Sequence, residues 1–267
     1  MEKTSLIIST YNRPDALSLC LKSVKQQSVL PGEVLVADDG SGPETKLLIE
    51  QFQKDFPVPL VHTWHPDEGF RLAAIRNRAI AAARYRYIIQ IDGDLILHPE
   101  FINDHIHFQK QGSFVAGSRV MLDESTTKQL LQHQSTDISK FRKGFSMNDL
   151  RSGLLRKFLA KRYKTSGKHK YYVKGCNMAF FKADLEKVNG YNEAFEGWGS
   201  EDREIASRLI HAGIEKRSIK MGAVCYHLFH PLPSREQAKT NEAKMFDAVQ
   251  KNSSWAEDGL NKYLSRS

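Results

Sequence analysis

The chain has 267 residues, 40% of them hydrophobic, which is enough apolar material to bury the core of one large α/β domain. It has no run near the roughly 18 consecutive apolar residues that a membrane span needs, and no charged and apolar regions of a cleavable signal, so we expect it in the cytoplasm. Three widely spaced cysteines exclude a CxxC zinc site, and the net charge of +8 indicates an acidic partner such as a nucleotide, nucleic acid or anionic lipid.

Strands and helices are expected to alternate along the first part of the chain. Short apolar, β-branched runs predict strands at residues 4–9, 33–37, 59–63 and 85–91. Helices are expected between them, from residue 14 to about 26, from 44 to 54 and from 71 to 83. This alternation predicts an α/β fold in which a mainly parallel sheet is flanked by helices and joined by right-handed crossovers.

Polar clusters follow three of these strands at their carboxyl ends, at residues 10–13, 38–41 and 92–94. Parallel strands end at one edge of a sheet, so these clusters are expected to meet in a single cleft. Asp92 and Asp94 repel each other unless a cation or donor groups hold them, which suits a hard divalent metal carrying phosphates. The alternative is an acidic turn, because Asp-Gly is a common turn pair.

Three motifs carry a resemblance to a known family: STYNRP at residues 9–14, ADDGS at 37–41 and DGD at 92–94. In this order and spacing they resemble family 2 of the inverting glycosyltransferases, which have the nucleotide-sugar-binding fold called GT-A. In that family the carboxylates of the last motif hold Mn2+ or Mg2+ on the diphosphate of a nucleotide sugar. The resemblance implies that Thr10 and Arg13 lie beside the nucleotide, Asp39 at the uracil edge, Asp92 near the ribose and Asp94 on the metal. Glycine between the two carboxylates is a minor departure from the commonest pattern.

Two arginines on the expected helix 71–83 are further candidates for nucleotide binding. The guanidinium groups of Arg71 and Arg76 offer fixed donors to phosphate oxygens. Arg71 lies near the helix start, where free main-chain N–H groups also favour an anion, and the family has a nucleotide-contacting arginine at a similar place. The alternative for Arg76 is a structural or solvated side chain.

After residue 94 a helix is expected at 99–109 and a strand at 114–120, and then the pattern loosens. Residues 123–171 form a basic insertion, and residues 151–174 include no acidic side chain. Apolar residues recur at helical spacing between 154 and 163 with basic residues between them. This segment is interpreted either as a basic amphipathic helix on an anionic membrane, or as a helix whose apolar face packs on the domain, or as a mobile lid.

The second half begins with an expected strand at 173–180 and leads to the string WGSED at residues 198–202, whose two acids open a helix to about residue 211. The acids alone fit ordinary helix capping. The whole string resembles a segment of the galactosyltransferase-like and chondroitin-polymerase-like members of the family, in which the aspartate is the catalytic base. The resemblance implies that Asp202 is the base, that Glu201 positions the acceptor, and that Trp198 with Gly199 contacts a sugar. Ser200 stands where a glycine is frequent.

Two histidines follow an expected strand that begins at residue 224. The related enzymes place a histidine here as a third metal ligand, which implies His227 as first choice and His230 as second. A mostly helical tail is expected from residue 234 to 264. We therefore expect one GT-A domain at 1–233, with a nucleotide half at 1–122, the insertion at 123–171 and an acceptor half at 172–233, followed by the tail at 234–267.

The resulting expectation is an inverting enzyme that moves a hexose or N-acetylhexosamine, such as galactose or N-acetylgalactosamine, from a UDP-sugar to an acceptor. The acceptor would be a saccharide or lipid-linked oligosaccharide of a bacterial surface polysaccharide, with peripheral contact at the inner face of the membrane and no nucleic acid partner. A sugar-phosphate nucleotidyltransferase is an alternative, but STYNRP is not the glycine-rich basic loop of such enzymes. The other alternative is a non-catalytic protein that binds anionic ligands through its positive charge.

Overall fold

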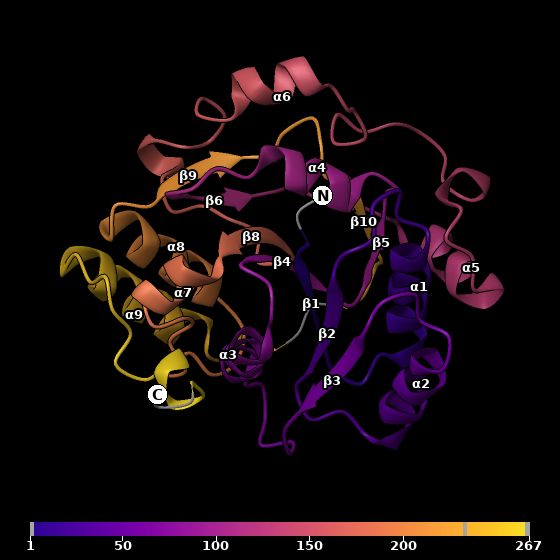
Figure 1. Ribbon diagram of the computed structural model, residues 1–267, viewed down its shortest axis with the longest axis horizontal. Coiled ribbons are helices and arrows are strands. Elements are labelled where there is room, and N and C mark those ends of the chain that lie inside the picture. The colour runs from indigo at the N-terminus through magenta and orange to yellow at the C-terminus, as the bar shows by residue number, and fades with distance from the viewer. Residues whose placement is uncertain (1–2, 232–233, 265–267) are drawn as a thin grey trace.

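The computed structural model describes residues 3–231 and 234–264, and it has the mixed α/β architecture that the sequence predicts (Figure 1). The strands of its central sheet are β1 Ser5–Thr10, β2 Glu33–Asp38, β3 Leu60–Trp64, β4 Tyr87–Asp92, β6 Ser113–Ala116, β8 Asn177–Phe181 and β9 Glu215–Ser218. They lie in the order β3-β2-β1-β4-β8-β6-β9. The first four strands of the chain pair in parallel, whereas β8 runs antiparallel to both of its neighbours.

Both faces of the sheet are covered by helices. Successive side chains of a strand point to opposite faces, and here the side chains on both faces are apolar and need burial. Leu6 and Ile8 of β1 belong to a buried cluster with side chains of α1 (Pro14–Lys25), α2 (Pro43–Gln53) and α4 (Phe101–Phe108). Ile7, between them, packs on the other face with α3 (Leu72–Ala82) and α8 (Glu201–His211). The continuous apolar run of this strand therefore reflects burial on both sides.

A second, three-stranded sheet joins segments that are far apart in the sequence. It contains β5 (Leu95–Leu97), β7 (Val120–Met121) and, in its centre, β10 (Cys225–His227). His227 pairs with Leu95, and the main-chain N–H of Leu228 donates to the carbonyl of Asp94 at 3.0 Å. This sheet, which we did not expect from the sequence, brings the histidine strand to the acidic end of β4.

Several elements after residue 94 differ from the expectation. The strand expected at 114–120 is divided into β6 and β7, because the chain leaves the central sheet between them and enters the second one. The strand expected at 173–180 is β8, which begins later. Further elements that were not expected include α5 (Glu124–His133), α7 (Lys182–Lys187) and β9. The sequence of β9 is the polar EKRS, so its pairing with β6 rather than an apolar run makes it a strand.

The basic insertion passes over α4, β6 and β9 (Figure 1). Its short helix α6 (Gly153–Leu159) is tied to α4 by Arg151, 3.1 Å from Asp104, and by Arg156, which pairs with the same carboxylate. Leu154 and Phe158 are 82% and 58% exposed. The expectation that the apolar face packs on the domain is therefore wrong for these outward residues, whereas Leu159 and Tyr163 are half-buried. Among the helices of the described residues, none combines the length and apolar composition that crossing a bilayer requires.

The tail is helical only in part. Helix α9 (Ala238–Gln250) packs against α8, and after a non-helical stretch a single turn of 3-10 helix, η3, spans Leu260–Lys262. The expected boundary at residue 233 and the last three residues of the expected tail lie outside the described residues.

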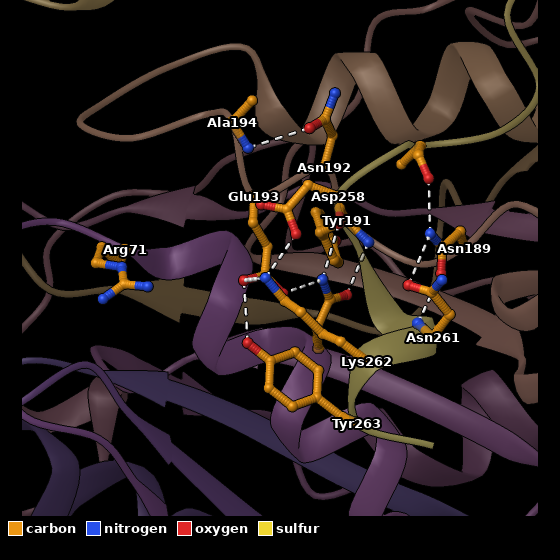
Figure 2. A network of polar contacts seen from close by, with 12 residues as sticks. Arg71, Asn189, Tyr191, Asn192, Glu193, Ala194, Asp258, Asn261, Lys262 and Tyr263 are labelled. Atoms are coloured by element: carbon orange, nitrogen blue, oxygen red, sulfur yellow. Dashed lines mark hydrogen bonds and ion pairs between the residues drawn. The ribbon is translucent and has the colours of Figure 1, made fainter. Parts of the chain in front are cut away.

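A buried carboxylate fixes the end of the tail to the rest of the domain (Figure 2). Glu193 accepts hydrogen bonds from the hydroxyl of Tyr263 at 3.0 Å and from Nζ of Lys262 at 2.7 Å. Its other oxygen accepts from Nδ2 of Asn77 on α3, at 2.9 Å. Its main-chain N–H donates to the carbonyl of Asp258 at 2.9 Å. The tail is thus joined to the helix that carries Arg76.

Candidate active site

A cavity of about 780 Å³ lies at the carboxyl ends of β1 and β4, facing the start of α8 and the residues that follow β10. This is the edge at which the sequence predicts a cleft. Most of the expected site residues line it: Thr10, Arg13, Asp39, Arg76, Asp92, Asp94, Trp198, Glu201, Asp202, His227 and His230. Arg71 and Gly199 are not among the described residues that line it.

Asp94, His227 and His230 form a compact group whose donor atoms all lie within 4.8 Å of one another. Oδ2 of Asp94 is 3.5 Å from Nε2 of His227 and 3.3 Å from Nε2 of His230. Nδ1 of His230 lies 2.7 Å from the carbonyl of Pro231, which can only accept a hydrogen bond, and Nε2 is the ring nitrogen that faces Asp94. Oδ1 of Asp94 is buried without a hydrogen-bond partner among the described residues. An orphaned carboxylate oxygen beside two imidazoles fits a divalent cation.

Glycine at position 93 is explained by a close approach of two strands. Its N–H donates to the carbonyl of Ser9 at 2.7 Å. A Cβ on Gly93 would lie 3.1 Å from that oxygen and 3.2 Å from Cβ of Thr10. The glycine between the two carboxylates therefore fits the contact between the ends of β1 and β4.

Arg76 links the two halves of the cavity wall. Its side chain is 1% exposed, and Nε donates to the hydroxyl of Ser9 at 3.2 Å. Nη2 lies 3.0 Å from Oδ1 of Asp92, and Nη1 lies 3.3 Å from Oε1 of Glu201. Its donors are thus engaged by protein acids, which supports the structural alternative raised for this arginine. Its contact with a nucleotide stays a prediction.

Glu201 and Asp202 occupy the first turn of α8, where free main-chain N–H groups favour negative charge. Oδ2 of Asp202 accepts from the N–H of Gly175 at 2.9 Å, and Oδ1 accepts from the N–H of Arg203 at 2.7 Å. Burial raises the pKa of Asp202. Burial, with the nearby charge of Asp202, raises the pKa of Glu201 to about 7. A carboxylate whose pKa is raised toward neutrality is a more effective proton acceptor.

Asp39 is fixed in the wall by contacts that the sequence did not indicate. Nε2 of His65 lies 2.7 Å from Oδ1 of Asp39, and the main-chain N–H of Arg71 donates to Oδ2 at 3.0 Å. The guanidinium of Arg71 pairs with Glu68, and Figure 2 shows this side chain apart from the tail contacts. Arg71 therefore holds Asp39 through its main chain, and a nucleotide contact of its side chain stays a prediction.

The aromatic end of the WGSED string forms part of the cavity rim. The guanidinium carbon of Arg235 lies 5.0 Å from the ring centroid of Trp198. Gly199 has a φ of 112° and Ser200 a φ of 70°, so both lie in the left-handed region that favours glycine. A glycine at position 200 would adopt this turn without strain.

Several cavity residues were not found from the sequence. Arg119 lies between β6 and β7 and donates to Sγ of Cys176 at 3.2 Å. Lys174 and Gly175 precede β8 and line the cavity beside Asp202. The stretch VKGC was visible in the sequence only as a small-residue strand, and no charge pattern separated Lys174 from the other basic residues of this region.

The sequence matches the model of glycosyl transferase family 2 over residues 5–188, more than half of the chain. The chain belongs to glycosyl transferase family 2. A second match, to the N-terminal domain of galactosyltransferase, covers residues 156–231. The two matches confirm the family and the galactosyltransferase-like character expected of the second half.

Similar proteins agree with this assignment. Chondroitin synthase of Escherichia coli is 27% identical over 237 residues, which are 84% of this chain and 34% of the relative. Hyaluronan synthase of Pasteurella multocida is 27% identical over 253 residues, 90% of this chain and 26% of the relative. The chain thus spans about a third or less of these relatives.

The fold is shared with a solved structure, S. aureus TarS in complex with UDP-GlcNAc. The TM-score is 0.63 at 16% identity, and the match covers 98% of this chain and 69% of that chain. At this identity the likeness shows the fold, and it confirms the expected GT-A architecture.

Proposed function

We propose that the chain transfers a hexose or N-acetylhexosamine from a UDP-sugar to a saccharide acceptor, with inversion at the anomeric carbon. The observation that carries this proposal is that the Asp94, His227 and His230 group and the Glu201 and Asp202 pair line one cavity. The UDP-GlcNAc complex of the similarly folded TarS supports the donor class. The similarity to chondroitin synthase and hyaluronan synthase supports a saccharide acceptor. We propose that this acceptor belongs to a bacterial surface polysaccharide or a lipid-linked oligosaccharide.

In this proposal residues 1–122 bind the donor. Thr10, Asp39 and Asp92 line the cavity where the base and ribose would lie. Arg13, 3.3 Å from Asp94, is partly exposed and can pair with phosphate oxygens. Mn2+ or Mg2+ bound by Asp94, His227 and His230 would neutralise the negative charge that develops on the departing diphosphate.

Residues 172–233 bind the acceptor and supply the base. Asp202 takes the proton of an acceptor hydroxyl as that oxygen forms its bond to the anomeric carbon. The bond from this carbon to UDP breaks at the same time, and the electron pair leaves with the phosphate oxygen. Attack from the face opposite to UDP turns an α-linked donor into a β-linked product without a covalent sugar intermediate. Glu201 orients the acceptor, and Trp198 provides a surface for a sugar ring. Gly199, which does not line the cavity, would contact the sugar only at its rim.

The test is to incubate the protein with Mn2+ and separate UDP-hexoses and UDP-N-acetylhexosamines, and to measure the release of UDP with and without oligosaccharide acceptors. Wild type should use at least one donor, and Asp202→Asn should lose transfer by about 10²-fold or more. Asp55→Asn, which alters an exposed aspartate paired with Lys25, is the matched control. Transfer by Asp202→Asn at the wild-type rate would overturn the assignment of the base.

We also propose that α6 rests on an anionic membrane surface, which would make a cytoplasmic chain peripheral to the inner face of the membrane. The supporting observation is the outward position of Leu154 and Phe158 beside basic residues such as Lys157 and Arg162. An amphipathic helix binds anionic lipid by burying such side chains while lysine and arginine meet the headgroups.

A further inference from the structure

A second cavity, of about 140 Å³, lies where the insertion crosses the ends of β6 and β9. Its walls come from Ser118 and Arg119 after β6, from Lys216 in β9 and Lys220 just after it, from Tyr163 of the insertion and from Tyr172 directly after the insertion. None of the family motifs reaches this cavity.

The charges around this cavity are all of one sign. Five of the described residues that line it are cationic, and none is acidic. They are Arg119, Lys164, Lys174, Lys216 and Lys220. Like charges gathered in a small concave space raise the local positive potential and favour an anion.

Lys216 is the most informative of these cations because it is buried, at 5% exposure. Its Nζ donates to the main-chain carbonyls of His169 at 2.8 Å and Tyr172 at 2.5 Å. Burial, with the nearby charge of Lys164, lowers the pKa of Lys216 to about 8. A buried ammonium that has carbonyl partners but no carboxylate keeps an uncompensated charge, which a bound anion would offset.

The two tyrosines order the other lysines without neutralising them. Nζ of Lys164 lies 5.3 Å from the ring centroid of Tyr163 and 5.5 Å from that of Tyr172. Nζ of Lys220 lies 5.6 Å from the ring of Tyr163, and Nζ of Lys174 lies 5.4 Å from that of Tyr172. Lys220 also donates a hydrogen bond to Oδ1 of Asn148. These ring faces and this amide hold the ammonium groups in place, and none of them carries a negative charge.

The small cavity adjoins the acceptor side of the active site. Arg119, Val173 and Lys174 line both cavities. The next residue, Gly175, donates its N–H to Asp202. One short segment therefore has the small basic cavity on one side and the proposed base on the other.

We infer that the small cavity binds an anionic group of the acceptor, a carboxylate or a phosphate, while an acceptor hydroxyl lies at Asp202. The inference rests on the proposed function and specifies the acceptor class as an acidic saccharide. Lys164, Lys174 and Lys220 are the specificity-determining residues, and the buried Lys216 adds a further positive charge.

The experiment compares acceptors that differ in one charged group. Three acceptors are titrated into the UDP-loaded protein: a hexuronate-containing tetrasaccharide, its carboxyl-reduced neutral analogue and a glycerol phosphate oligomer. Transfer to each is then measured separately, with a UDP-sugar that wild type uses as the donor. One of the two acidic compounds should bind about tenfold or more tightly than the neutral one, and its affinity should fall strongly as the salt concentration rises. A preference for the hexuronate indicates a carboxylate, and a preference for the phosphate oligomer indicates a phosphate. Equal binding of all three would overturn the inference.

Variants locate the effect. The double change Lys164→Gln and Lys220→Gln should raise the KM for the acidic acceptor about tenfold, with little change for the neutral analogue and in acceptor-free release of UDP. Lys168→Gln, an insertion lysine that does not line the cavity, is the matched control. An unchanged KM in the double variant would contradict the inference while leaving the transferase intact. Loss of UDP binding by wild type would instead contradict the proposed function itself.

Discussion

The main-chain N–H of Gly175 donates a hydrogen bond of 2.9 Å to Oδ2 of Asp202. The contact joins the segment before β8 to the first turn of α8 and orients the carboxylate that we propose as the base. A Cβ on Gly175 would lie 3.3 Å from Cβ of Asp202 and 3.5 Å from Nη1 of Arg76. The absence of a side chain at position 175 thus keeps this acid and this arginine close together.

Gly175→Ala should therefore damage turnover more than donor binding. We expect kcat to fall about tenfold because the added methyl group shifts Asp202, while the Kd for UDP changes little. Steady-state kinetics and calorimetry check this. Gly153→Ala is the control, since a Cβ there meets only the end of the Arg156 side chain, at 4.0 Å. A parallel loss of UDP affinity would contradict the separation of donor and acceptor halves.

The ionised side chain of Glu201 should lower the free energy of unfolding near neutral pH. Its pKa is raised from 4.5 to about 7 in the folded protein, chiefly by burial, so ionisation of the folded form is unfavourable. The raised pKa contributes to the free energy of unfolding in full below pH 4.5, where Glu201 is protonated. This contribution is lost as the pH rises through 7. Glu201→Gln, which stays neutral, should raise the free energy of unfolding by about 1–3 kcal/mol at pH 8 and by little at pH 4.

Denaturant unfolding at the two pH values measures this difference, with the exposed Glu44→Gln as control. A gain that is equal at both pH values would show that the effect does not come from ionisation of Glu201.

The tail contact should contribute to global stability. Glu193→Gln removes the ion pair with Lys262 and sets an amide donor against the donors of Lys262 and Tyr263, so we expect a loss of about 2 kcal/mol. The urea midpoint should fall, whereas Glu196→Gln, at an exposed neighbouring position, should leave it unchanged. An unaltered midpoint for Glu193→Gln would mean that the tail is not part of the cooperative unit.

The outward face of α6 predicts selective lipid binding. Wild type should sediment with vesicles that contain phosphatidylglycerol and much less with pure phosphatidylcholine vesicles. The double change Leu154→Gln and Phe158→Gln should reduce binding about tenfold or more, because two exposed apolar side chains no longer enter the interface. Leu47→Gln, on the exposed side of α2, should have no effect. If the double variant and the Leu47 variant bound these vesicles equally, the assignment of α6 as the lipid-binding surface would be wrong.

The strands and helices of the first part of the chain were well predicted because local sequence determines them. The apolar runs of β1 and β4 and the polar residues after them indicated both the strands and the edge at which they end. The position of His230 beside Asp94 was harder to predict from the sequence. It depends on the pairing of β10 with β5, two strands that are far apart in the sequence. Lys164 and Lys220 could not be grouped, since only the path of the insertion over β9 brings them to one cavity.

The outward face of α6 illustrates a different limit. The spacing of its apolar residues indicated an amphipathic helix, but periodicity does not say what covers the apolar face. The ion pairs of Arg151 and Arg156 with Asp104 decide which side faces the domain. This information lies in the tertiary contact and not in the helix itself.

The most direct test of the account is a calorimetric titration of UDP with and without Mn2+, on wild type and on Asp94→Asn. Asp94 is the carboxylate shared by both histidines, so we expect wild type to bind UDP tightly only with Mn2+ and the variant to lose that dependence together with most of its affinity. Wild-type UDP binding that is unaffected by Mn2+ and by the substitution would contradict the metal group. No binding of UDP under any of these conditions would contradict the proposed donor.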